Sequence, residues 1–147
     1  MFFKIISAGT SGIEGYIVEV EADMTKGLPG FSLVGLPNAA VKESKERIKS
    51  AVCNSGFRYP NKKIIVNLSP ADIKKEGSHY DLAIALAILR EVENIAEEKF
   101  EDIAFIGELS LDGKLKPIKA CTALILGILK NSKIKKVIIP FENFNES

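Results

Sequence analysis

Residues 82–89 constrain the fold of this chain more than any other segment, because they contain no polar or charged side chain. The run lies within residues 79–95, where we expect a helix that is apolar almost all round in its first half. A helix of this kind is stable only when other elements cover it. The run is far shorter than the roughly 18 residues of a membrane span, so the cover must come from the chain itself.

The remaining sequence supplies elements that can provide this cover. Helical spacing of apolar residues predicts one helix from Pro37 to the stop signal at Gly56 and another over residues 119–130. Segments rich in Ile, Val, Phe and Tyr predict strands at residues 2–8, 13–21, 31–35, 63–69, 103–109, 114–118 and 135–140. At 147 residues the chain fits one domain, residues 1–147. The element order predicts an α/β or α+β domain with buried helices.

Two local patterns refine this prediction. Residues 63–69 are apolar almost without interruption, which is typical of a strand covered on both faces. Asp112 and Gly113 separate the expected strands at 103–109 and 114–118, and Asp-Gly is a strong signal for a hairpin turn. We therefore expect a sheet inside the domain and a segment around residue 112 that folds back on itself.

Composition excludes several classes of protein. Lys plus Arg is 20 and Asp plus Glu is 19, so the whole chain is neither a strongly basic nucleic-acid module nor an acidic disordered tail. The two cysteines, Cys53 and Cys121, form no cluster with each other or with the single histidine, which argues against a zinc site. We expect both to be buried small hydrophobes in a soluble protein of the reduced cytoplasm, with no membrane association.

Nucleotide-binding motifs are absent from the sequence. Neither G-x-x-x-x-G-K-[ST] nor G-x-G-x-x-G occurs. The glycines at Gly27, Gly30 and Gly35 surround Leu-Pro and carry no following Lys-Ser or Lys-Thr, so they indicate a turn. We expect no cofactor in this chain and no nucleotide hydrolysis by it alone.

A serine, the only histidine and an aspartate follow one another closely before the apolar helix, at Ser78, His79 and Asp81. A catalytic triad needs the histidine between the nucleophile and the acid in space, and immediate neighbours in sequence point in different directions. Ser78 with Asp81 three residues later instead matches a capping box at the helix start. We therefore expect Ser78 to cap the helix, and His79 and Tyr80 to be partly exposed at its start without a lysine partner.

Two stretches are locally basic. Residues 38–63 hold seven Lys or Arg against two Glu, and residues 112–136 hold seven Lys against one Asp. If both lie on one face, they could attract a phosphate backbone. The alternative is a solvated lysine-rich face balanced by the acidic residues 91–102. We expect no aromatic residues among the basic ones, although single-strand binders often have them.

The sequences of residues 34–47, 67–78 and 106–118 resemble a known family. They read VGLPNAAVKESKER, NLSPADIKKEGS and IGELSLDGKLKPI, and they are similar to the N-terminal domain of magnesium-chelatase-like AAA+ ATPases of the ComM/YifB type. The resemblance covers essentially the whole chain. It implies an α+β fold like ribosomal protein S5 domain 2, with a mixed sheet and about three packed helices. The Lon protease domain shares this fold.

The resemblance to Lon also implies which residues of this chain occupy the positions of the protease serine and lysine. Lon-type proteases carry a nucleophilic serine in a turn before a buried helix, and the matching stretch here, residues 76–81, places His79 at that position. The position of the protease lysine falls on Thr122. The Ser-Lys pair is then missing, and acyl transfer has neither nucleophile nor base. A register shifted by one residue would instead offer Ser78 and Lys119, which keeps a peptidase as an alternative.

The family implies a function for a longer protein. The tail at residues 141–147 has no closing helix or charged end, which together with the resemblance favours a domain cut from a chain with a downstream ATPase module. We expect that module to bind ATP and magnesium and to form hexamers that act on DNA as a helicase, in branch migration during competence. This domain, with no catalytic, cofactor or metal residues, would contact neighbouring subunits, a partner or DNA. A chelatase accessory role is the third alternative.

Overall fold

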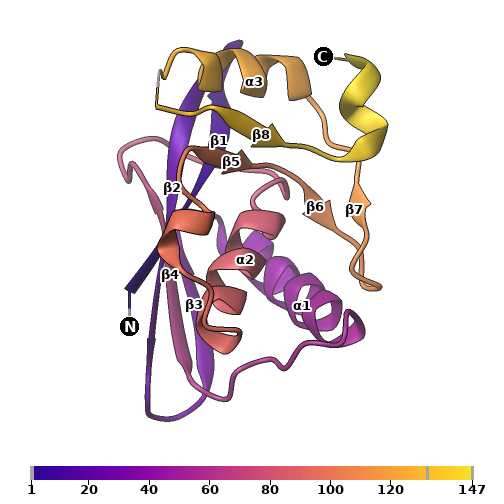
Figure 1. Cartoon of the computed structure of the whole chain (residues 1–147). Helices are drawn as coiled ribbons and strands as arrows, with labels where there is room; N and C mark the ends of the chain where they lie inside the picture. The colour runs from indigo at the N-terminus through magenta and orange to yellow at the C-terminus, as the bar shows by residue number, and fades with distance from the viewer. Residues whose placement is uncertain (1, 132, 147) are drawn as a thin grey trace.

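The computed structural model describes residues 2–131 and 133–146 and has the α+β architecture expected from the sequence (Figure 1). One mixed sheet runs through the molecule, with helices on both of its faces. The elements are β1 (Phe2–Ser11), β2 (Glu14–Thr25), β3 (Gly30–Val34), α1 (Asn38–Asn54), β4 (Lys63–Ser69), α2 (Asp81–Val92), the 3-10 turn η1 (Glu97–Lys99), β5 (Ile103–Phe105), β6 (Glu108–Leu109), β7 (Leu115–Lys116), α3 (Cys121–Leu129), β8 (Lys136–Ile138) and the 3-10 segment η2 (Phe141–Glu146).

The six strands of the large sheet lie in the order β3-β4-β2-β1-β5-β8. The long hairpin of β1 and β2 is antiparallel and forms its centre, with Ile5 opposite Val20. β2 and β4 are antiparallel, whereas β3 with β4, β1 with β5, and β5 with β8 are parallel pairs. The sheet is therefore mixed, as predicted.

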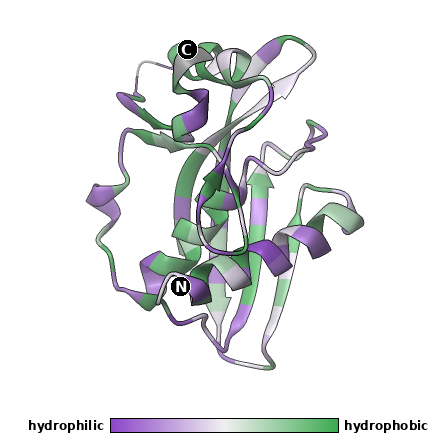
Figure 2. Cartoon of the chain, turned by 90° about the vertical axis from the view of Figure 1, so that its right-hand side faces the viewer, coloured by the Kyte–Doolittle hydropathy of each residue, from purple (hydrophilic) through white to green (hydrophobic). Residues whose placement is uncertain are grey.

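Side chains along the central hairpin point alternately to the two faces of the sheet, and each face carries its own hydrophobic core. Ile5, Val18 and Val20 point to the face that α1 and α2 cover, where they join the larger cluster of buried residues. Ala8 points to the opposite face, where a smaller cluster gathers around α3. The alternation is visible as green and purple bands along the strands in Figure 2. One hairpin thus supplies both cores, because successive side chains of a strand point to opposite faces.

The apolar helix is buried, as its sequence predicts. Ala83, Ile84, Ala87 and Ile88 of α2 have no exposed surface. The helix contacts β1, β2 and β6 and lies beside α1 (Figure 1). None of the helices in the described residues has the length and apolarity that a membrane crossing requires.

The expected strand at residues 103–109 is in fact two strands in different sheets. β5 belongs to the large sheet, while β6 pairs with β7 in a separate two-stranded hairpin around Asp112 and Gly113. The break lies at Gly107, whose N–H donates to the carbonyl of His79 and whose carbonyl accepts from the N–H of Leu82. The start of α2 therefore takes the backbone hydrogen bonds that a continuous strand would use. The hairpin prediction is confirmed, and the single-strand prediction is wrong.

The prediction that residues 63–69 are covered on both faces is also wrong. Ile64, Val66 and Leu68 are buried against the larger core, but Lys63 and Ile65 are exposed on the other face. The reason is the position of α3, which contacts β1 and β2 on that face, whereas no contact between α3 and β4 of comparable extent is present in the described residues. β4 is a half-covered strand whose exposed positions include an isoleucine.

Candidate functional site

The histidine at the start of α2 is held by the backbone of β1. His79 Nε2 lies 3.0 Å from the carbonyl oxygen of Ala8, so Nε2 carries the proton that is donated. The ring is tilted against the ring of Tyr80, with 4.1 Å between centroids. Burial lowers the pKa of His79 to about 4, although the Ala8 carbonyl acts in the opposite direction. His79 is therefore a neutral imidazole at pH 7 and has no hydrogen bond to Ser78 or to an acid among the described residues.

Tyr80 corrects one expectation at this site. His79 is partly exposed, as predicted, but Tyr80 is only 1% exposed. Its hydroxyl lies over Gly9 of β1, where a Cβ would come within 2.5 Å of the phenol oxygen. The absence of a side chain at Gly9 makes the space that this tyrosine fills. The sequence carries this signal only as a glycine within a strand.

Ser78 does not cap the helix. α2 begins at Asp81 after Tyr80, and no side-chain hydrogen bond caps its N-terminus. The carboxylate of Asp81, which is fully buried, turns instead toward α1 and the β6–β7 hairpin. Arg47 Nε donates to Asp81 Oδ2 at 2.7 Å, Ser44 Oγ donates to Oδ1 at 3.3 Å, and the N–H of Leu109 donates to Oδ2 at 3.2 Å. The capping-box prediction is wrong because long-range partners bind the carboxylate.

The hydrogen bonds and the ion pair of Asp81, which we call the Asp81 network, join α1, α2 and the β6–β7 hairpin. The side chain of Arg47 is 20% exposed and that of Asp81 is 0% exposed. Burial raises the pKa of Asp81, while the hydrogen bond and the charge of Arg47 lower it, and burial is the largest of these effects. An ion pair of this kind fixes how α1, α2 and the hairpin are placed, and the sequence analysis did not find it.

The residues proposed for a protease pair do not interact in this structure. Lys119 is exposed in the turn before α3, and Thr122 is exposed in the first turn of α3. Ser78 is half-buried in the loop before α2, and no hydrogen bond joins it to Lys119 in the part of the chain that the structure describes. Neither register of the Lon comparison brings a serine hydroxyl and a lysine amine together here.

The first basic stretch borders a groove at the end of α1. The groove has a volume of about 470 Å³, and it is lined by Pro29, Gly30, Phe31, Lys45, Lys49, Cys53, Tyr59, Pro60, Asn61 and Lys62. No acidic residue is among these lining residues. Lys45 and Lys49 are one helical turn apart on α1, where like charges repel each other in the absence of a bound anion. We call this hollow the lysine groove.

An aromatic ring lies beneath one of these lysines. Lys49 Nζ is 5.6 Å from the ring centroid of Tyr59, within range of a cation–π contact. Burial raises the pKa of Tyr59 to about 12, so its hydroxyl stays protonated and can donate a hydrogen bond. The expectation that no aromatic residue accompanies the basic ones is therefore wrong, because Tyr59 and Phe31 both line the lysine groove.

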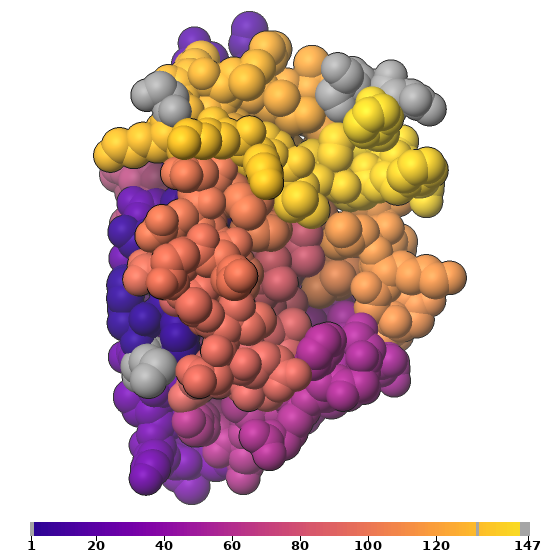
Figure 3. All heavy atoms as spheres, in the orientation of Figure 1, coloured from indigo at the N-terminus to yellow at the C-terminus, as the bar shows by residue number. Residues whose placement is uncertain are grey.

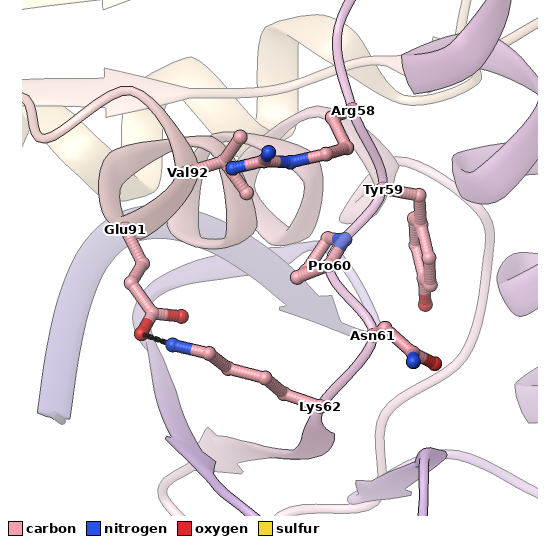
Figure 4. Close-up of a pocket in the computed structure, with 7 residues that line it drawn as sticks. All are labelled: Arg58, Tyr59, Pro60, Asn61, Lys62, Glu91 and Val92. Atoms are coloured by element: carbon pink, nitrogen blue, oxygen red, sulfur yellow. Dashed lines mark hydrogen bonds and ion pairs between the residues drawn. The ribbon is translucent and has the colours of Figure 1, made fainter.

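The segment at residues 58–62 separates the lysine groove from a second hollow of about 410 Å³ (Figure 4). Arg58 and Lys62 point to the side of Val92 and Glu91, whereas Tyr59 and Asn61 point the other way. Lys62 Nζ lies 2.5 Å from Glu91 Oε1. The charge of Lys62 is thus offset by a carboxylate, whereas Lys45 and Lys49 form no ion pair with another residue in the described part of the chain.

The second basic stretch does not extend this groove. Its lysines are spread over β7, the turn before α3, the end of α3 and β8, and α3 and β8 lie at the end of the molecule opposite the α1–β4 connection (Figure 1). Lys135 lies 3.9 Å from Asp102, which offsets part of its charge. The lysines of α3 and β8 therefore form a region separate from the lysine groove, whereas the β6–β7 hairpin lies against the end of α1, where Asn54 Nδ2 donates to the carbonyl of Leu111.

The burial of the cysteines was predicted with partial success. Cys121 is buried, but Cys53 is exposed, so the expectation of two buried cysteines is wrong for Cys53. Neither forms a disulfide among the described residues. Among residues 2–131 and 133–146 no three His, Cys, Asp or Glu side chains are grouped as metal ligands.

The family of this chain is shown by comparison with known proteins. Residues 20–143 match the family described as subunit ChlI of Mg-chelatase. The chain belongs to this Mg-chelatase subunit family.

Several relatives resemble the chain over nearly its full length. It is 40% identical over 92% of its length to the protein YifB of Escherichia coli, and 38% identical over 97% to the competence protein ComM of Haemophilus influenzae. These matches cover 26% and 28% of the two relatives, so the chain spans about a quarter of their length. A more distant relative is a Lon protease of Trichlorobacter lovleyi, 26% identical over 90% of the chain and 17% of that protein.

Proposed function

We propose that this chain is a non-catalytic domain of a larger, cytoplasmic magnesium-chelatase-like AAA+ ATPase that acts on DNA, and that its lysine groove contacts nucleic acid. Membership of the Mg-chelatase subunit family and the relative named as a competence protein support the ATPase assignment and its connection to DNA. ATP and magnesium are bound by the ATPase module of the larger protein, which forms a hexameric helicase. The domain has the fold of ribosomal protein S5 domain 2.

The observation that carries the proposed contact is the chemistry of the lysine groove. Lys45 and Lys49 present two positive charges with no carboxylate among the lining residues, and Tyr59 places an aromatic ring beside them. Lysines that follow a phosphate backbone, with rings that stack on bases, are the means by which proteins bind single strands. The ligand that best fits the groove is therefore single-stranded nucleic acid.

A matched pair of variants tests this proposal. The binding of a fluorescent single-stranded oligonucleotide to the 147-residue chain is measured by anisotropy at low salt. We expect Lys45→Gln with Lys49→Gln to weaken binding at least tenfold, and the control Lys130→Gln with Lys136→Gln, at the other end of the molecule, to weaken it much less. Equal losses from both pairs would contradict a site at the lysine groove.

A Ser-Lys peptidase is the second candidate, and its support is the Lon protease relative. It requires Ser78 to react as a nucleophile with Lys119 as its base. Labelling of the chain by a serine-reactive fluorophosphonate, lost in Ser78→Ala and retained in Thr122→Ala, would establish this activity. We expect that the reagent labels neither the unaltered chain nor the two variants.

A further inference from the structure

The outer side of α3 is apolar where it faces solvent. Leu126 is 56% exposed and Leu129 is 69% exposed. With Thr122 they occupy positions spaced four and three residues apart, which lie on one side of a helix. A surface helix of a domain that is complete by itself normally turns polar residues to water on this side. We call Thr122, Leu126 and Leu129 the outer face of α3.

A second apolar segment lies against the same helix. η2 contacts α3, and its Phe141 and Phe144 are 91% and 70% exposed. η2 is firmly attached to the domain, because the side-chain amide of Asn143 donates to the carbonyl of Ile118 at 2.9 Å and accepts from the N–H of Ile118 at 2.8 Å. The two hydrogen bonds between Asn143 and Ile118 therefore fix η2 in a position where Phe141 and Phe144 are exposed to solvent.

The two segments gather at one end of the molecule. In the space-filling view the orange of α3 and the yellow of the C-terminal residues meet at the top of the domain (Figure 3). Four large apolar side chains, Leu126, Leu129, Phe141 and Phe144, are each more than half exposed in this region. Exposed apolar side chains concentrated on neighbouring elements mark an interaction surface.

We propose that the outer face of α3, together with Phe141 and Phe144, is the surface on which the rest of the full-length protein docks. This inference rests on the proposed function in one respect, that the domain is part of a larger ATPase. The relatives extend far beyond the matched region, because the match covers only 26% of YifB and 28% of ComM. The last described residues lie beside α3 (Figure 1), so a segment tethered to them would reach this surface at a high effective concentration.

The structure favours this occupant over a nucleic acid. The exposed groups here are leucines and phenylalanines, which gain free energy by burial against another apolar surface. Lys45 and Lys49 of the lysine groove lie on α1, away from α3. Docking and nucleic-acid binding therefore use different regions of the domain.

Hydroxyl-radical footprinting of side chains tests the docking surface directly. The full-length protein and the 147-residue chain are labelled under the same conditions. We expect a severalfold loss of oxidation at Leu126, Leu129, Phe141 and Phe144 in the full-length protein. Leu28, which is 90% exposed, and Leu111 on the β6–β7 hairpin are the controls and keep their labelling. A full-length variant with Leu126→Asp and Leu129→Asp should regain oxidation at Phe144.

Two results would overturn the proposal. Equal oxidation of the four side chains in both proteins would show that the remainder of the protein does not cover them. Protection that already appears in the 147-residue chain and grows with its concentration would assign the surface to a second copy of this chain. Neither result depends on binding to the lysine groove, so failure of docking and failure of the proposed nucleic-acid contact can be distinguished.

Discussion

The two sides of the six-stranded sheet differ in how completely they are covered. On one side α1 and α2 enclose the larger core, and α1 turns charged residues such as Lys42 and Glu46 to solvent. On the other side α3 covers a smaller core and turns Leu126 and Leu129 to solvent. The same sheet thus carries one side that is complete by itself and one that leaves apolar surface unburied, which agrees with the proposal that α3 has a partner.

The difference extends to how the helices are held. The α1 and α2 side is held by an ion pair between the half-buried Arg47 and the fully buried Asp81. The α3 side relies on the close approach of two backbones, since a Cβ at Gly15 would lie 2.3 Å from the carbonyl oxygen of Ala123. A polar network holds the helices on one side, and close backbone contact at Gly15 holds α3 on the other. We therefore expect loss of a charge to destabilise the first side and an added side-chain carbon at Gly15 to destabilise the second.

The largest effect is expected on the α1 and α2 side. Arg47→Met removes the cation that pairs with the fully buried carboxylate of Asp81. Breaking a buried pair by removing one partner costs roughly 3–5 kcal/mol of unfolding free energy. Urea denaturation of the variant measures this loss. Arg58→Met, on an exposed residue, is the control and should change the unfolding free energy by less than about 0.5 kcal/mol; a similar small change for Arg47→Met would contradict the role of the network.

A pH dependence is expected from the junction between α2 and β1. In the unfolded chain His79 takes up a proton near pH 6.5, whereas in the folded chain its pKa is about 4. The folded state therefore loses stability as the pH falls from 6.5 to 4, by about 3 kcal/mol at most. His79→Gln keeps an N–H for the Ala8 carbonyl and does not titrate.

The comparison of these two proteins isolates the histidine. The raised pKa of Asp81 acts in the opposite direction, because it stabilises the folded state as the pH falls through its own range. Both proteins contain Asp81, so the difference between their unfolding free energies at pH 7 and pH 4.5 reports His79. A difference that does not change with pH would show that His79 is accessible to protons in the folded state.

A smaller effect is expected on the α3 side. Gly15→Ala introduces a Cβ that meets the backbone of α3 at Ala123 and Gly127. Such overpacking typically costs about 1–3 kcal/mol. Gly30→Ala is the matched control, since a Cβ at Gly30 has no neighbour within 4 Å. Thermal unfolding should separate the two variants, and equal melting temperatures would mean that α3 moves away without cost.

Local patterns were enough to predict much of the fold. The apolar run at residues 82–89 predicted a buried helix, and Asp112-Gly113 predicted the hairpin. The break at Gly107 was missed because its hydrogen-bond partners belong to the start of α2, more than twenty residues earlier. The exposed side of β4 was missed because an apolar run in sequence does not reveal how far α3 reaches across the sheet.

The site was less predictable than the fold. The partners of Asp81 on α1 are 37 and 34 residues away, so its local pattern with Ser78 suggested a cap. The basic composition of residues 38–63 indicated the region that contains Lys45 and Lys49, but only the fold shows that Tyr59 lies beneath Lys49. Long-range contacts decided the role of each of these side chains, and charge composition identified only the region.

The salt dependence of oligonucleotide binding tests the proposed function most directly. For single strands, the logarithm of the binding constant falls with the logarithm of salt concentration by about 0.7 per neutralised phosphate. The account predicts that the slope of Lys45→Gln with Lys49→Gln is shallower than that of the unaltered chain by about 1.4. Equal slopes for the two proteins would contradict the account, because Lys45 and Lys49 would then contact no phosphate.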